Sequence, residues 1–226
     1  MEILPTIKKF IQLTKDDNQH RYTSWEICYQ AFDSFDDKEF LSLHLAGYLA
    51  SWGMYRGSSG LLQKNYLIHT GAIDKIEKAS ILRCTPTREI RPEDIDRLLK
   101  LIKELQTYYR SITYVKENGV SKRITATDTL ISKIILGTLG CLPALDRYYL
   151  IGAQDYFQKQ GNKQKINDLK SNSLETLLAF IHNKYEEILL AQQQIRKTRN
   201  IYYPVMKICD MFFWQIDYDI ETEKKQ

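Results

Sequence analysis

The sequence lacks the short motifs that identify many enzymes and metal proteins. Its 226 residues include four cysteines, all far apart and none in a Cys-x-x-Cys pair. This argues against a zinc ribbon, a cysteine-ligated iron–sulfur cluster and a disulfide framework. No GxxxxGK[ST], HExxH or GxSxG sequence is present, and the four histidines show no metal-ligand spacing. We therefore expect four buried thiols, no metal and no cofactor.

Long apolar runs are also missing, and charge of either sign is nearly balanced. No stretch is long and apolar enough to span a bilayer, and MEILPTIKKF at the start does not have the layout of a signal peptide. With 32 basic and 28 acidic residues, the formal net charge of +4 permits an anionic partner without requiring one. We expect a soluble cytoplasmic monomer with no membrane partner.

Helical periodicity runs along nearly the whole chain. Apolar residues recur at three- and four-residue spacing in five segments: 41–52, 95–105, 130–139, 174–188 and 206–212. Helix starts are indicated at Pro92 and Pro204, and a helix end at Gly53. The segment 174–188 predicts one long helix. The periodicity predicts an all-α fold with about ten helices in all.

One segment, residues 111–129, has an extended pattern. Asn118–Gly119 is a strong turn signal between β-branched residues, so a short hairpin or a plain loop fits equally. Short connections elsewhere predict one compact multi-helix domain over residues 1–226. Two interleaved helical lobes fit this pattern too, but no boundary between them can be placed.

Residues 125–149, TATDTLISKIILGTLGCLPALDRYY, combine an anion-binding pattern with a single carboxylate. Basic and hydroxyl side chains precede or begin its apolar helix: Lys122, Arg123, Thr127 and Thr129. Such groups suit a phosphate oxygen, although an ordinary capped helix explains them as well. After a glycine- and proline-containing turn, Asp146 begins the next helix. Asp146 is either a helix cap or a catalytic carboxylate.

This arrangement resembles the helix-hairpin-helix family of DNA glycosylases. In that family a small turn starts an apolar helix that ends at a glycine, and a proline-containing turn leads to a catalytic aspartate. Here residues 143–149, PALDRYY, take the place of the family's Pro-Val-Asp-Thr-His-Val motif, with Asp146 as the aspartate. The family's glycine-rich hairpin is replaced by residues 124–129, and its histidine by Tyr148. Its Schiff-base lysine would fall near Thr129, so lyase chemistry is not expected there.

The resemblance implies a monofunctional DNA glycosylase with its active site between two helical lobes. Asp146 would stabilise an oxocarbenium-like transition state and align the attacking water, after the nucleotide has been flipped out. The residues expected to contact the extruded base are Trp52, Tyr55, Arg56, Tyr148 and Tyr149. Those expected to contact DNA are Lys122, Arg123, Thr127, Thr129, Lys133 and Arg147. The excised base would be damaged or modified, in repair or in defence against modified phage DNA.

Two other functions stay open. One is a non-catalytic nucleic-acid-binding helical protein, in which Asp146 only caps a helix and the glycine-flanked segment around Trp52 is an ordinary helix end. The other is a protein-interaction module whose charge is incidental. Segments similar to ASWGMYRGSS and DRYY also occur in bacterial proteins, which adds no chemistry to any of these functions.

Overall fold

The computed structural model describes residues 2–17, 19–56, 59–116, 118–161, 165–199 and 201–224. Within them it contains ten α-helices: α1 (Ile3–Gln12), α2 (Ser24–Ser34), α3 (Lys38–Ser51), α4 (Thr70–Lys78), α5 (Ile95–Ser111), α6 (Asp128–Thr138), α7 (Arg147–Lys159), α8 (Ser171–Asn183), α9 (Tyr185–Thr198) and α10 (Val205–Glu223). Short 3₁₀ turns lie at Arg21–Thr23, Leu61–Gln63, Tyr66–His69, Ser80–Leu82 and Pro92–Asp94. The predicted all-α fold is confirmed.

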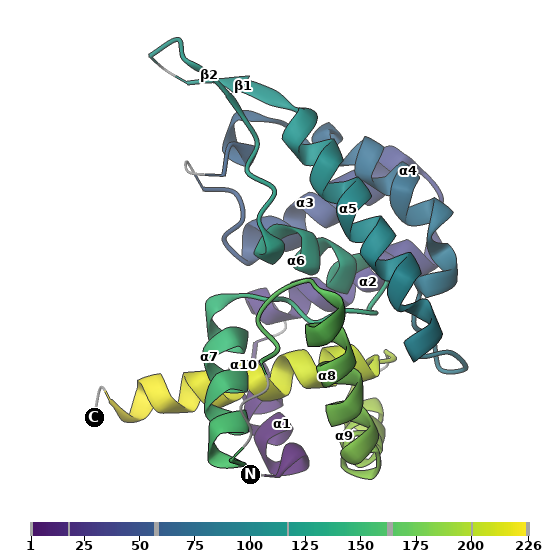
Figure 1. Cartoon of the computed structure of the whole chain (residues 1–226), viewed down its shortest axis with the longest axis vertical. Coiled ribbons are helices and arrows are strands. Elements are labelled where there is room, and N and C mark those ends of the chain that lie inside the picture. The colour runs from purple at the N-terminus through teal and green to yellow at the C-terminus, as the bar shows by residue number, and fades with distance from the viewer. Residues whose placement is uncertain are drawn as a thin grey trace.

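The helices form two groups stacked along the long axis (Figure 1). The upper group holds α2 to α6, and the lower group holds α1 together with α7 to α10. The N-terminal helix α1 therefore packs on α9 and α10, which lie at the other end of the chain. One large cluster of buried apolar side chains includes residues of both groups. The two groups share a core.

Helix α6 occupies the centre of the molecule, and it is buried from Leu130 to its last residue. Its apolar circumference, already visible in the sequence, explains this position. Trp25 of α2 donates from its indole nitrogen to the carbonyl of Leu136 at 2.9 Å. Gly137 admits the ring of Tyr48 from α3, because a Cβ there would lie 2.5 Å from that ring. These two contacts pack α6 against both α2 and α3.

The predicted helix over residues 174–188 is wrong, because two helices occupy this segment. α8 ends at Asn183, Lys184 takes a non-helical conformation, and α9 begins at Tyr185. No glycine or proline marks the break, and the apolar period continues in phase across it. The break redirects the chain so that α9 packs on α1.

The extended segment forms a hairpin rather than a plain loop. Strand β1 (Thr113–Val115) pairs with β2 (Ser121–Arg123) in an antiparallel register that sets Tyr114 opposite Lys122. Gly119 in the turn has a φ of 76°, a left-handed conformation that glycine adopts without strain. Other local signals also hold: α3 stops just before Gly53, and Pro204 precedes α10.

The burial of the cysteines agrees with a further expectation from the sequence. All four cysteines are free and buried, as expected for small apolar side chains: Cys28, Cys84, Cys141 and Cys209. Of the helices in the described part of the chain, none has the length and apolar character needed to cross a membrane.

Candidate functional site

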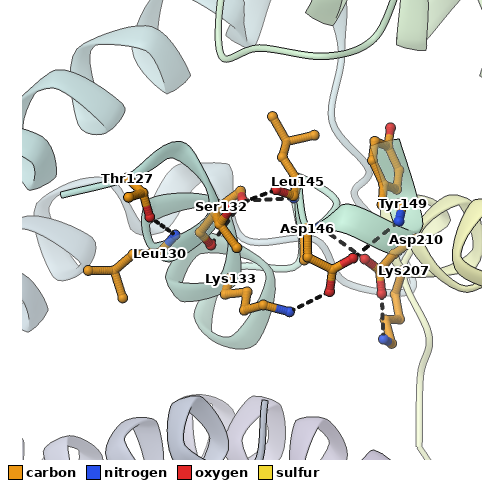
Figure 2. Close-up of polar contacts among 11 residues, drawn as sticks. Thr127, Leu130, Ser132, Lys133, Leu145, Asp146, Tyr149, Lys207 and Asp210 are labelled. Atoms are coloured by element: carbon orange, nitrogen blue, oxygen red, sulfur yellow. Dashed lines mark hydrogen bonds and ion pairs between the residues drawn. The ribbon is translucent and has the colours of Figure 1, made fainter. Parts of the chain in front are cut away.

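Asp146 is the N-cap of α7, and it is also half of an ion pair (Figure 2). Its Oδ1 accepts a hydrogen bond from the backbone N–H of Tyr149 at 3.1 Å, which satisfies one of the free amides of the first turn. Its Oδ2 lies 2.8 Å from the Nζ of Lys133. The Lys133 side chain is 3% exposed and that of Asp146 is 18% exposed. The carboxylate is therefore the member of the pair that solvent reaches.

Two hydrogen bonds hold the turn before Asp146 against α6. Thr129 donates from its hydroxyl to the carbonyl of Leu145 at 2.8 Å, and the N–H of Leu145 donates to the hydroxyl of Ser132 at 2.9 Å. Figure 2 shows the bond between Leu145 and Ser132. Lys133 follows Ser132 directly, so the same packing brings its ammonium to Asp146. The N-terminal turns of α6 and α7 thus meet at one place, and each carries a partial positive charge.

A second buried ion pair, from α10, supports this turn. Lys207 and Asp210 lie 2.7 Å apart, with side chains 4% and 10% exposed. Oδ1 of Asp210 accepts a hydrogen bond from the N–H of Ala144 at 3.0 Å, two residues before Asp146. Sequence reasoning missed this pair. The available signal was the presence of two charges, three residues apart, in the apolar run that begins α10.

Aromatic rings pack around the two ammonium groups. The Nζ atoms of Lys133 and Lys207 lie 4.8 and 5.9 Å from the ring centre of Trp52, within the range of cation–π contact. Tyr22 stacks on Trp52 with ring centres 5.1 Å apart. Trp214 of α10 lies edge-on to both rings. Trp52, from the end of α3, thereby joins the upper helix group to α10.

The aromatic packing continues to the residues that follow Asp146. The ring of Tyr148 lies 4.9 Å from that of Trp214, which stacks on Tyr218 at 5.0 Å. We call these five rings the aromatic cluster: Tyr22, Trp52, Tyr148, Trp214 and Tyr218. Trp52, Tyr148 and Tyr218 are half-buried. The indole N–H of Trp52 is buried and has no hydrogen-bond acceptor among the described residues.

The prediction that Tyr149 contacts an extruded base is wrong. Its side chain is fully buried, and its ring lies edge-on to Phe213 of α10 at 5.4 Å. Burial raises the pKa of its hydroxyl well above the usual value. Tyr148 and Tyr149 point in different directions because neighbours on a helix are about 100° apart. Of these two tyrosines, only Tyr148 belongs to the aromatic cluster.

Packing already uses the side chains of two predicted DNA contacts: the prediction for Lys133 is wrong, and that for Thr129 stays a prediction. Lys133 is buried and bound to Asp146, so it cannot meet a phosphate at the surface. Thr129 is half-buried and donates to Leu145. Their spacing from the helix start placed them at the N-terminal end of α6, but the turn before α7 covers that side.

The other predicted DNA contacts are exposed, and their role stays a prediction. Lys122 and Arg123 lie on β2, and Thr127 caps α6 by accepting from the N–H of Leu130 at 3.1 Å. Arg147 is exposed on the first turn of α7 and forms an ion pair with a glutamate of α10, Glu221.

Neither a metal cluster among the described residues nor a comparison with known proteins names the chemistry of this site. Among the described residues, no three histidine, cysteine, aspartate or glutamate side chains come together as metal ligands would. Against protein-family models, curated proteins and solved structures, the chain has no match. Its function is therefore inferred from the geometry around Asp146.

Tyr55 and Arg56, two of the predicted base contacts, do not belong to the aromatic cluster. Arg56 is exposed, and Tyr55 is half-buried with its hydroxyl 2.8 Å from Nε2 of His69. His69 is fully buried, and its Nδ1 lies 2.7 Å from the hydroxyl of Tyr109. Tyr55 thus closes a buried hydrogen-bonded chain of three side chains. The ring of His44, by contrast, is half-buried and packs on Phe40.

His69 is expected to make the protein sensitive to acid. Burial lowers its pKa from 6.5 to about 3, so below pH 6.5 the unfolded chain binds more protons than the folded chain does. The stability that depends on neutral His69 is present above pH 6.5 and is lost as pH falls toward 3. Between pH 7 and pH 4 this loss should be about 3 kcal/mol of unfolding free energy.

Urea denaturation at pH 7 and pH 4 measures this effect. His69→Gln retains a donor and an acceptor for the two tyrosines but does not titrate, so its free energy of unfolding should fall less between the two pH values. Equal losses in the wild type and the variant would mean that His69 is not the acid-sensitive group.

Proposed function

We propose that this protein is a monofunctional DNA glycosylase and that Asp146 is its catalytic carboxylate. One observation carries the proposal: a half-buried carboxylate begins α7 and is fixed by Lys133, whose ammonium lies 4.8 Å from the ring centre of half-buried Trp52. Hydrolysis of an N-glycosidic bond needs a fixed negative charge near the sugar, because the transition state resembles an oxocarbenium ion. It also needs a flat apolar surface for the extruded base. Asp146 and the aromatic cluster supply these two requirements together.

The contacts of Asp146 suit a carboxylate that aligns water. Each of its oxygens accepts one hydrogen bond, from Tyr149 and from Lys133. A carboxylate offers about four acceptor positions, so acceptor capacity is left on both oxygens. Because the two existing bonds fix the orientation of the group, little reorganisation is needed when positive charge develops on the sugar.

The aromatic cluster supports binding of an extruded base. Trp52 comes from the upper helix group and Tyr148 from the lower one, and both rings pack on Trp214. Stacking on an aromatic ring stabilises a bound base by about 1–3 kcal/mol, which offsets the few kcal/mol that flipping costs.

Exposed polar groups near Asp146 support contact with the DNA backbone. Thr127 begins α6 and Arg147 begins α7, and both are exposed. Hydroxyl and guanidinium groups at helix starts are typical phosphate contacts. Lys122 and Arg123 extend this exposed polar surface onto the hairpin. The nucleotide would thus be held on both sides of the carboxylate.

Base release from DNA tests the proposal. The wild-type protein is incubated with duplexes that each carry one oxidised, alkylated, mismatched or deaminated base, and with modified phage genomes. Hot alkali then converts abasic sites into strand breaks. We expect breaks after alkali on one class of substrate, and no covalent adduct when borohydride is present.

Two results would change the assignment. Duplex binding without base release on any DNA would favour the non-catalytic nucleic-acid-binding protein. A borohydride-trapped adduct that is absent with Lys133→Gln would mean that the amine of Lys133, rather than water, attacks the sugar.

A further inference from the structure

The β1–β2 hairpin projects from the upper helix group as a separate arm (Figure 1). It is the only sheet in the described residues, and its two strands pair with each other alone. Beyond the strands, Lys116 donates from its N–H to the carbonyl of Val120 at 3.0 Å. At its base, Ile124 donates from its N–H to the carbonyl of Ile112 at 2.9 Å. Hydrogen bonds thus hold the arm together from its base to its turn.

One buried ring fixes the arm to the body. Tyr114 is buried, whereas the other residues of both strands are exposed. Its ring packs on Gly60, where a Cβ would lie 2.4 Å from it. Gly60 also has a φ of 76°. Glycine is therefore favoured here both by the close approach of the ring and by the left-handed backbone conformation. The arm therefore has a defined direction, and its base lies against the segment that follows Trp52 and Arg56.

The exposed side chains of the arm combine positive charge with aliphatic surface. Val115 is 61% exposed and Val120 is 47% exposed, one on each side of the turn. Lys116, Lys122 and Arg123 are exposed, and none has an ion-pair partner among the described residues. Aliphatic groups at the end of a projecting arm are in contact with water unless a partner covers them. Free cations beside them indicate an anionic partner.

The shape of the arm favours duplex DNA over other anionic partners. Two strands lie about 4.8 Å apart, and the major groove, about 12 Å wide, admits a two-stranded ribbon. Cations on the strands would then meet phosphates, and valine methyl groups would meet thymine methyl groups. The arm also leads to the candidate site: four residues after Arg123 comes Thr127, the cap of α6.

We infer that the hairpin is a DNA-docking arm, which inserts into the major groove next to the nucleotide that reacts at Asp146. This inference rests on the proposed function, because it takes DNA as the substrate. Val115 contacts base edges in the groove from one face of the ribbon and Val120 contacts the groove wall from the other, whereas Lys116, Lys122 and Arg123 contact phosphates on either side. The arm orients the duplex before a base is extruded.

Equilibrium binding of the full chain to a fluorescent duplex, measured at several salt concentrations, tests the arm. The triple variant Lys116→Gln, Lys122→Gln, Arg123→Gln should bind about tenfold more weakly or worse at 0.1 M salt. Its slope of log K against log salt should be shallower by about 2.7, since each phosphate contact contributes about 0.9. The double variant Val115→Ser, Val120→Ser should bind about threefold more weakly with an unchanged slope.

A matched control separates the arm from net charge. The variant Lys8→Gln, Lys15→Gln, Lys197→Gln removes three exposed cations from α1, the turn after it and α9. It should leave affinity and slope near those of the wild type. Because all substituted residues are exposed, unfolding midpoints should not differ among these variants. Equal weakening by the two triple variants would overturn the inference.

Two further outcomes separate the arm from the catalytic proposal. If wild type binds vesicles containing phosphatidylserine but not the duplex, the arm is not a DNA contact, and the hairpin inference fails. If the wild type releases no base but the hairpin variants still lose duplex affinity and slope as expected, the DNA-docking role of the arm is supported and the glycosylase activity is rejected.

Discussion

Asp146→Asn is expected to lower the rate of base release by about 10²–10³-fold, the usual effect of removing one preorganised electrostatic partner. Asparagine caps a helix as well as aspartate does, so the bond from the N–H of Tyr149 can be retained. What the substitution removes is the negative charge beside the sugar. Duplex affinity should change little, because the exposed cations stay in place. Single-turnover base release and duplex binding, measured on the same preparations, check both parts.

Asp155→Asn is the matched control on the same helix. Asp155 pairs with Lys159 at 2.7 Å, and its side chain is 25% exposed, so it resembles Asp146 in charge, pairing and helix. Its substitution should leave base release unchanged. Asp146→Asn also leaves the buried ammonium of Lys133 without its carboxylate, which destabilises the fold. Rates must therefore be compared at a temperature where both variants are folded.

Full activity in a folded Asp146→Asn protein would mean that this residue only caps α7. The ion pair with Lys133 would then be structural, like the pair that Lys207 and Asp210 form beneath the same turn. In that case the exposed cations would favour a binding protein without catalysis.

The sequence predicted those features that depend on a few neighbouring residues. Thr127 and Asp146 each accept a hydrogen bond from an N–H three residues later, so their cap positions follow from local chemistry. Helix ends at Gly53 and Gly140 depend on the left-handed φ of single residues, 70° and 68°. The central place of α6 followed from its apolar circumference.

The contacts of the candidate site depend on packing between distant segments, which periodicity does not determine. Lys133 reaches Asp146 only because α6 and the turn before α7 are bonded to each other, and Lys207 reaches the same turn from α10. A lysine in an amphipathic helix pattern is usually predicted to be exposed to solvent. Here two buried lysines are satisfied by carboxylates and by the ring of Trp52.

The sequence also carries a signal for the orientation of α7. Tyr149, Gly152, Ala153 and Tyr156 follow helical spacing, and all four are buried. Two small residues between two aromatic ones indicate a close approach to another helix. This pattern would have placed Tyr149 in the core and left Tyr148 on the side of the site.

Gly152→Ala is expected to cause the largest loss of stability among single substitutions at the glycines that the structure describes. A Cβ at this position would lie 1.9 Å from the carbonyl oxygen of Phe213, a backbone atom of α10. No rotamer change relieves that overlap, so α7 and α10 must separate along their contact. Overpacking of a core costs about 1–3 kcal/mol, and we expect about 3 kcal/mol here, measured as the free energy of unfolding in urea.

Gly47→Ala is the control, because Gly47 lies on the exposed side of α3 with no atom within 4 Å of an added Cβ. Alanine there should stabilise the protein by about 0.5–1 kcal/mol. Separation of α7 from α10 would also move Asp146 and Tyr148 away from Trp214. Gly152→Ala should therefore lose base release even at temperatures where it is still folded, whereas Gly47→Ala should retain it. Wild-type stability in Gly152→Ala would mean that α7 and α10 are farther apart than described.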